Sequence, residues 1–297
     1  MPPAASSSPS AGAGRDGASG LRGRLRSGAP IAATFVMIPR IEIVEMAVGA
    51  GFDAVVCDLE HGQMAVEDLP VLHAAARAAG AYSLARIASE RPVEISRALD
   101  MGVDGVIVPH VASRAAAEQL AAAGRFPPAG ERSLNPYVRG VGYGLNGDYQ
   151  TGPANERSAL VAMIEGTDAL GAVDEIAAVA QLDALFFGPV DLAAALGFPG
   201  QPEHPQVIAT IGDLVRRLAA AGVATGIYAP TAGAARRWLD LGVQLVVASA
   251  DNAMTKTAFA AMRAAIDEPA ASASPQPGNQ DGAGQDPAAQ TAALPAR

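Results

Sequence analysis

Residues 54–80 read AVVCDLEHGQMAVEDLPVLHAAARAAG and combine two patterns. The first four residues are apolar and rich in valine, which favours a strand that is covered on both faces. From Val66 onward, apolar residues recur three and four positions apart among many alanines, which indicates a helix. Gly80 stands where a glycine commonly ends a helix. The stretch therefore predicts a strand, a charged turn and a helix, in that order.

The same alternation continues along most of the chain. Eight short apolar runs are expected to be strands, at residues 31–37, 53–59, 82–87, 104–109, 159–165, 183–188, 223–228 and 243–249. Segments with helical spacing follow several of them, at residues 66–80, 91–102, 113–124, 205–222 and 231–242. Glycines that we expect to cap these helices are Gly80, Gly102, Gly124, Gly222 and Gly242.

Eight strand and helix units in succession predict an α/β fold, the (β/α)8 TIM barrel, as a single domain over residues 21–267. A doubly wound open sheet is the alternative, but the first strand lacks the glycine-rich phosphate loop that often follows it in that fold. Residues 1–20 and 268–297 are rich in Pro, Ala, Ser and Gly. Such segments bury too little apolar surface to fold, so we expect disordered tails.

Composition narrows the functional classes. The formal net charge is −9 and the chain has no basic block, which argues against nucleic acid as a partner. Neither a membrane span nor a signal peptide is expected, because long uncharged apolar runs are missing from the sequence. The single cysteine, Cys57, excludes an internal disulfide and is interpreted as a small buried hydrophobic residue in a cytoplasmic protein.

One connection is unusually long. Residues 125–157 are rich in Gly, Pro, Asn and Arg and include Tyr137 and Tyr143. Long irregular segments within a compact domain are often functional. This segment is therefore interpreted as a lid or as a contact with another subunit.

Barrel enzymes place their active sites at the C-terminal ends of the strands. In chain order, the polar residues expected there are Asp58, Glu60, His61, Arg86, His110, Glu165, Asp191, Ser249 and Asp251. Glu165 and Asp191 follow neighbouring strands, which lie about 4.8 Å apart. Two carboxylates at that range repel unless a cation lies between them, and Mg²⁺ or Mn²⁺ prefers such oxygen ligands. Alternatively, each acid caps the helix that follows it.

The remaining polar residues favour one type of reaction. Arg86 stands among apolar residues, so it must be paired or face the barrel mouth, where it suits a carboxylate or an enolate. His61 is a candidate base near neutral pH, oriented by Asp58. Zinc is disfavoured because cysteine pairs and closely spaced histidines are missing, and His73 is interpreted as structural. A metal site, a base and a cation equip a metal-dependent aldolase. A Schiff-base aldolase needs a lysine, and the barrel strands contain none.

Several motifs, taken in order, resemble the HpcH/HpaI aldolases, relatives of the citrate lyase beta chains. They are DLEHG (58–62), ARI (85–87), RALDMGVDGVIVPHV (97–111), RFPPAGER (125–132), MIEG (163–166), FFGPVDLAAALG (186–197) and GIYAP (226–230). The resemblance covers residues 21–266. It implies a TIM barrel, a hexamer with a swapped last helix, and Mg²⁺, Mn²⁺ or Co²⁺ without an organic cofactor. It also implies reversible cleavage into pyruvate, or a similar 2-oxo acid, and an aldehyde.

The resemblance also implies roles for residues of this chain. His61 is the base and Asp58 its partner, while Arg86 holds the substrate carbonyl or enolate oxygen. Glu165 and Asp191 bind the metal, and the backbone amides of Val190 and Asp191 receive the carboxylate of pyruvate. Glu60 matches its motif without a role that we can assign.

Two departures from the family pattern concern the substrate. Met163 replaces a glutamine that many of these aldolases have, which removes a polar contact near the substrate or the metal. The segment after residue 132 also differs, so its side chains, Arg132, Asn135, Tyr137, Arg139 and Tyr143, are expected to line a different acceptor pocket.

Two alternative functions remain at this stage. A lyase that cleaves a CoA thioester, such as malyl-CoA or citramalyl-CoA, would need a basic surface for CoA. A non-catalytic barrel subunit would lack at least one of His61, Arg86, Glu165 and Asp191, and all four are present.

Overall fold

The computed structural model describes residues 20–145 and 152–267. Its strands are β1 (Ile31–Val36), β2 (Ala54–Asp58), β3 (Tyr82–Arg86), β4 (Gly105–Val108), β5 (Ala159–Ile164), β6 (Ala184–Phe187), β7 (Ala224–Ala229) and β8 (Leu245–Ala250). Its helices are α1 (Gly20–Arg26), α2 (Ile41–Gly49), η1 (Val66–Asp68), α3 (Leu69–Ala78), α4 (Pro92–Asp100), α5 (Arg114–Gly124), η2 (Arg139–Gly144), α6 (Pro153–Arg157), α7 (Thr167–Gly171), α8 (Val173–Ala177), α9 (Pro189–Ala195), α10 (Pro205–Ala220), α11 (Ala232–Asp240) and α12 (Asp251–Asp267). The two predicted tails, residues 1–20 and 268–297, lie outside this description except for Gly20, the first residue of α1.

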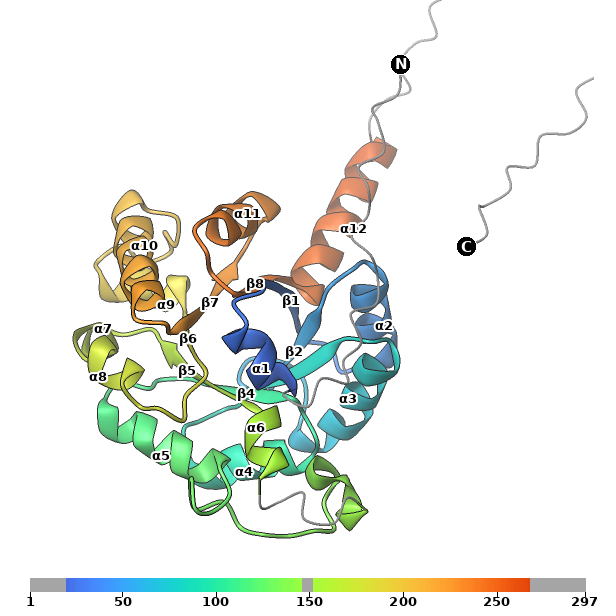
Figure 1. Cartoon of the computed structure of the whole chain (residues 1–297). Helices are drawn as coiled ribbons and strands as arrows, with labels where there is room; N and C mark the ends of the chain where they lie inside the picture. The colour runs from blue at the N-terminus through green and yellow to red at the C-terminus, as the bar shows by residue number, and fades with distance from the viewer. Residues whose placement is uncertain (1–19, 146–151, 268–297) are drawn as a thin grey trace, which may run out of the picture. The chain divides into compact units, whose positions relative to one another are not determined.

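The strands form a closed parallel barrel in sequence order, with β8 paired to β1 (Figure 1). Closure excludes the open sheet, and each of the eight predicted runs contains or closely overlaps a strand. The chain divides into two compact units, one ending at Thr257 and the other beginning at Ala258, and the barrel belongs to the first. The TIM barrel predicted from the repeated units is therefore confirmed.

Alternate residues of each strand enter two apolar layers. Ala54 and Val56 of β2 belong to the layer inside the barrel, whereas Val55 and Cys57 belong to the layer between strands and helices. Leu21 of α1 also belongs to the inner layer, so this helix closes one end of the barrel (Figure 1). Burial, reinforced by the charge of Asp58, raises the pKa of the Cys57 thiol to about 12. Cys57 is therefore a buried, protonated hydrophobic residue, as expected.

Four of the five predicted capping glycines have the left-handed backbone that a cap requires, namely Gly80, Gly102, Gly222 and Gly242. The prediction for Gly124 is wrong. This residue is the last residue of α5, and a Cβ atom there would lie 2.5 Å from a methyl carbon of Leu160. Close packing of α5 against β5 explains this glycine.

A buried ion cluster holds the N-terminal face of the barrel. Asp183 accepts hydrogen bonds from Arg22 Nε at 2.8 Å and from Arg125 Nη2 at 2.5 Å, and its Oδ2 atom also accepts from the Leu160 amide at 2.9 Å. Arg125 is fully buried, and this burial lowers the pKa of its guanidinium to about 10 despite the charge of Asp183. The first arginine of the RFPPAGER motif is thus structural.

The long segment that begins at residue 125 lies at this same face. Arg132 pairs with Asp100 at the end of α4 at 2.5 Å and stacks over Phe126. Gly140 packs against the Leu99 carbonyl, where a Cβ atom would clash at 2.2 Å. At this face the helices end and the strands begin, so it is opposite the catalytic mouth. The predicted lid over the mouth, and the predicted acceptor pocket beside it within one chain, are therefore wrong. Contact with another subunit stays a prediction, and residues 146–151 lie outside the description.

The helices of the described ranges include none that is long and apolar enough to cross a membrane.

Candidate active site

A buried ion pair joins the C-terminal ends of β2 and β3. The strand register places Asp58 opposite Arg86. Arg86 donates from Nε to Asp58 Oδ1 at 2.9 Å and from Nη2 to Oδ2 at 2.6 Å, the two-pronged geometry that suits a carboxylate. The Arg86 guanidinium also lies 4.5 Å from the centre of the Phe35 ring. Burial alone would lower the pKa of Arg86, but Asp58, with Glu60 and Glu165, raises it overall. Arg86 is therefore a fixed cation in the barrel mouth.

Asp58 also shapes the turn that follows β2. Its Oδ1 atom accepts from the backbone amides of Glu60 at 3.1 Å and of His61 at 3.3 Å. The Gly62 amide donates to the Asp58 carbonyl at 3.1 Å, and a Cβ atom on Gly62 would lie 2.1 Å from that oxygen. The DLEHG motif is therefore a tight turn in which only glycine fits the last position.

The expected pairing of the His61 ring with Asp58 is not what the structure shows. The two oxygens of Asp58 are occupied by Arg86 and the turn amides. The His61 side chain is 65% exposed, and its Nε2 atom lies 3.9 Å from Glu60 Oε2. Asp58 pairs with Arg86 instead because the strand register places these two buried residues opposite each other. The His61 imidazole stays at the exposed rim.

Glu60 lies at the centre of the mouth, which the sequence did not reveal. Its side chain is largely buried, with Oε2 at 3.3 Å from Arg86 Nε and Oε1 at 3.5 Å from His110 Nε2. A single carboxylate thus faces the arginine and both histidines. In a continuous strand, Asp58 and Glu60 would lie on the same face. β2 ends at Asp58, so Glu60 belongs to the turn and its position could not be predicted from strand periodicity.

Glu165 is held by His110. The His110 amide donates to Glu165 Oε1 at 2.6 Å, and His110 Nδ1 lies 2.7 Å from the same oxygen. His110 has φ 57°, a left-handed conformation that is costly for a residue other than glycine and is often found at functional sites. The sequence placed His110 among the polar residues expected at the strand ends, without a role. The structure places it at the mouth with its ring largely exposed.

Burial is the main cause that raises the pKa of Glu165, and the charges of Glu60 and Asp191 add to it against the lowering effect of His110. Asp191 is exposed in the first turn of α9. Its charge acts on Glu165, so the structure brings these two predicted ligands into electrostatic contact. The repulsion between the carboxylates is the kind that a bound cation relieves.

The other predicted substrate contacts surround this pair. Met163 is buried on β5, and its Cε atom would lie 2.7 Å from a Cβ atom on Gly188, so Gly188 gives this side chain its space. Val190 is half exposed in the first turn of α9. The first amides of a helix have no acceptor within that helix, so those of Val190 and Asp191 suit a carboxylate.

Asp251 and Tyr228 also lie at C-terminal strand ends. Asp251 is buried and accepts from the amides of Met37 and Ile38, each at 3.0 Å, so it fixes the end of β1 instead of facing substrate. Tyr228 on β7 is half-buried, which raises the pKa of its phenol while the charge of Arg86 opposes this. In the sequence, Tyr228 belongs to the GIYAP motif at a strand end, without a predicted role.

Within the described ranges, no group of three or more His, Cys, Asp or Glu side chains is arranged to hold a metal ion. The protein would thus supply a cation with one or two carboxylates and leave the other positions to water and substrate. Mg²⁺ commonly binds in this way, unlike structural zinc.

A closed (β/α)8 barrel with a fixed arginine and two interacting carboxylates at its mouth has the arrangement of a barrel enzyme, whose active site lies at this end of the strands. The model of the HpcH/HpaI aldolase/citrate lyase family matches residues 32–255, and the chain belongs to this family. It is an aldolase, and therefore a carbon–carbon lyase.

Known relatives are similar over most of their length. A pyruvate aldolase of Rhizobium etli is 37% identical over 232 residues, which cover 78% of this chain and 91% of the relative. A 5-keto-4-deoxy-D-glucarate aldolase of Escherichia coli is 36% identical over 209 residues, covering 70% and 81%. The crystal structure of a family protein from Burkholderia cenocepacia superimposes with a TM-score of 0.78 at 29% identity, covering 84% of this chain and 99% of the other.

Proposed function

We propose that this aldolase reversibly cleaves a 4-hydroxy-2-oxo acid into pyruvate, or a similar 2-oxo acid, and an aldehyde. The observation that carries the proposal is the mouth itself, where Glu165 interacts electrostatically with the ion-paired Arg86 and with Asp191. A relative with 37% identity is named a pyruvate aldolase, which supports the 2-oxo acid product.

The family is metal-dependent, and we propose Glu165 and Asp191 as the ligands of Mg²⁺, Mn²⁺ or Co²⁺. Their oxygen donors and mutual repulsion fit a hard divalent cation. When bound, such a cation supplies Lewis-acid polarisation of the 2-oxo group.

The chain's own groups then divide the remaining work. Arg86 donates to the carbonyl oxygen, where negative charge develops as the carbon–carbon bond breaks, and Asp58 holds its guanidinium in place. The amides of Val190 and Asp191 orient the substrate carboxylate. Met163 forms an apolar wall beside this pocket. These contacts fix the reacting 2-oxo acid and leave the aldehyde end toward solvent.

His61 is our proposed base. Its exposed imidazole at the rim can accept the proton of the 4-hydroxyl group as the bond cleaves, with Glu60 in place of Asp58 as its acidic neighbour. The same ring returns a proton in the synthetic direction. His110 is already bound to Glu165 through its amide and ring, which favours a role in positioning that carboxylate.

Release of pyruvate from 4-hydroxy-2-oxo acids tests the proposed function. With Mn²⁺ or Mg²⁺ present, we expect turnover of short 4-hydroxy-2-oxo acids, measured as pyruvate by coupled oxidation of NADH. Malyl-CoA and citramalyl-CoA serve as controls for the thioester alternative. Faster turnover of the thioesters than of every hydroxy-oxo acid tested would contradict the proposal.

The structure offers little to the two alternatives. Arg86 at the mouth is ion-paired with Asp58. The arginines Arg77, Arg139 and Arg157 lie at the opposite end of the strands, which disfavours them as a CoA surface for this site. The four residues whose loss would indicate a non-catalytic subunit are present, and all four lie at the C-terminal end of the barrel.

We also propose a homo-oligomer, a hexamer by resemblance to the family, in a cytoplasmic location. Phe259, Met262 and Ile266 of α12 are exposed apolar side chains at helical spacing, which favours contact with another copy. The free and buried Cys57 fits a reducing compartment.

A further inference from the structure

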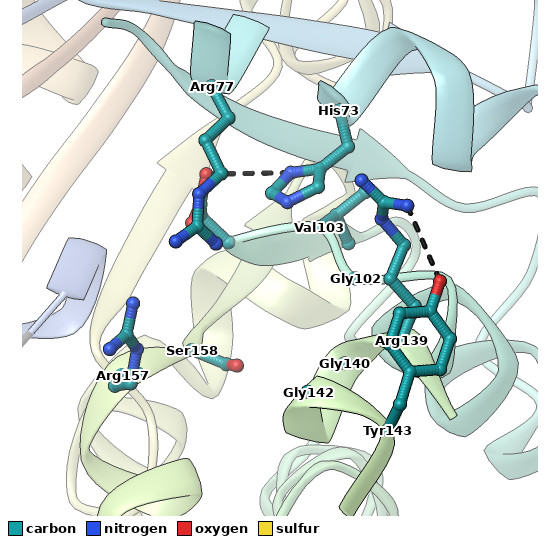
Figure 2. Close-up of a pocket in the computed structure, with 11 residues that line it drawn as sticks. His73, Arg77, Gly102, Val103, Arg139, Gly140, Gly142, Tyr143, Arg157 and Ser158 are labelled. Carbon is teal, nitrogen blue, oxygen red and sulfur yellow. Dashed lines mark hydrogen bonds and ion pairs between the residues drawn. The ribbon is translucent and has the colours of Figure 1, made fainter. Parts of the chain in front are cut away.

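Figure 2 shows a cavity whose lining residues include Gly102–Asp104 just before β4 and Ser158 just before β5. It therefore lies at the N-terminal face of the barrel, at the opposite end of the strands from the catalytic mouth. Its volume is about 250 Å³, enough for a small metabolite. Its walls come from the end of α3, the connection between α4 and β4, the η2 helix and the residues just before β5. His73, which lines the cavity, is hydrogen-bonded to Ser83 near the start of β3, whereas Arg86 at the other end of β3 lies in the mouth. The cavity and the mouth are therefore at opposite ends of this strand.

Three arginines line this cavity, namely Arg77 of α3, Arg139 of η2 and Arg157 of α6. In Figure 2, Arg77 and Arg157 extend toward each other from opposite walls, and the Tyr143 hydroxyl points toward Arg139. Arg139 donates to that hydroxyl at 3.4 Å. Three guanidinium groups around one small space are unexpected in a chain of net charge −9.

These cations have little compensation. The one acid among the lining residues is Asp104, and its Oδ2 atom accepts from the Ser83 amide at 2.9 Å and lies 3.9 Å from His73 Nδ1. Within the described ranges, Arg77, Arg139 and Arg157 form no ion pair with a carboxylate, although most of the other arginines there do. Charges of one sign that face one another in a partly enclosed space favour binding of the opposite charge.

The surrounding backbone holds this arrangement in place. The side-chain carbons of Arg139 lie against Gly102, where a Cβ atom would come within 3.0 Å of them. Tyr143 has φ 57°, a left-handed conformation that a tyrosine rarely adopts. Both features orient groups toward the cavity.

We propose that this cavity is a binding site for a small dianion, either a phosphate group or a dicarboxylate, separate from the active site. The planar forks of the arginines match the oxygens of either anion, and the Tyr143 and Ser158 hydroxyls add neutral donors. The site recognises charge and size, since its volume admits little beyond the anionic group and a short carbon chain.

Calorimetric titration of the full chain with inorganic phosphate and with succinate, at constant ionic strength set by chloride, tests the proposal. We expect saturable binding of at least one anion. Binding should weaken at least tenfold in the variant Arg77→Ala/Arg157→Ala. The variant Arg216→Ala/Arg236→Ala removes the same charge from exposed helix positions outside the cavity and should bind as the unaltered chain does.

Two further variants keep the outcome decisive. If the double variant does not fold, Arg77→Ala alone serves in its place. Arg77 is exposed, so this variant should fold, and it should weaken binding severalfold. Arg86→Lys alters the mouth and should leave this binding unchanged. The proposal is overturned if neither anion binds, if Arg77→Ala binds as tightly as the unaltered chain, or if Arg86→Lys removes the binding.

Discussion

Replacing Glu165 with alanine is expected to lower the affinity for Mn²⁺ by on the order of 100-fold or more and to abolish aldol cleavage. Loss of an outer-shell partner alone typically costs about 10- to 100-fold in metal affinity, and Glu165 is proposed as a direct ligand. Calorimetry or the paramagnetic signal of free Mn²⁺ measures the change. Glu175→Ala, which removes an exposed acid from α8, is the matched control and should bind the metal normally.

The pH dependence of metal binding follows from the same residue. Because burial raises the pKa of Glu165, this group takes up a proton at a higher pH than an ordinary glutamate does. Metal affinity should therefore fall, as pH decreases, before solvent-exposed carboxylates begin to titrate.

Full metal affinity in Glu165→Ala would show that the ligand assignment is wrong.

Replacing Arg86 is expected to remove activity while leaving the metal bound. A donor that stabilises charge developing in the transition state typically contributes about 10²- to 10³-fold to kcat. Arg86→Ala also leaves the buried Asp58 carboxylate unpaired, and breaking a buried ion pair costs about 3–5 kcal/mol of folding free energy. The alanine variant therefore confounds catalysis with stability.

Arg86→Lys separates the two effects. Lysine keeps the positive charge opposite Asp58 but lacks the planar fork that makes two hydrogen bonds. We expect a folded protein with normal Mn²⁺ affinity and a kcat lower by about 100-fold or more. Arg91→Lys, at an exposed position after β3, is the control. An unchanged kcat in Arg86→Lys would remove Arg86 from the reaction.

The fold could be predicted from the sequence because every strand carries the same signal. A buried parallel strand is an apolar run, and a covering helix repeats every three to four residues, so both elements appear locally. Gly124 departs from this local signal. A glycine at the end of a helix commonly indicates a cap, but here it serves the close approach of Leu160, a contact between elements distant in sequence.

The site was only partly predictable for a similar reason. The topology brings Asp58, Arg86 and Glu165 to one end of the barrel, so their grouping follows from the fold class. Their pairings do not, because the register that places Asp58 opposite Arg86 is a property of the assembled sheet. The central position of Glu60 and the backbone contact of His110 with Glu165 depend on turn geometry, which has no periodic signal.

The long segment after residue 125 gives a different lesson. Its composition favoured a lid or a contact with another subunit. The segment connects a helix to the following strand, and in this fold such connections lie at the N-terminal face. Arg132 and Gly140 lie there in the structure. Its position was therefore implied by the predicted order of elements, and topology is the stronger guide than composition.

Exchange of the methyl hydrogens of pyruvate with deuterated water tests the central claim most directly. An aldolase that stabilises the enolate of a 2-oxo acid must exchange these hydrogens without any aldehyde, and proton NMR follows their loss. We predict that treatment with EDTA lowers the exchange to the uncatalysed rate. Addition of Mn²⁺ or Mg²⁺ should restore the catalysed exchange. Exchange that is indifferent to EDTA, or that fails to occur with either metal for pyruvate and related 2-oxo acids, would contradict the account.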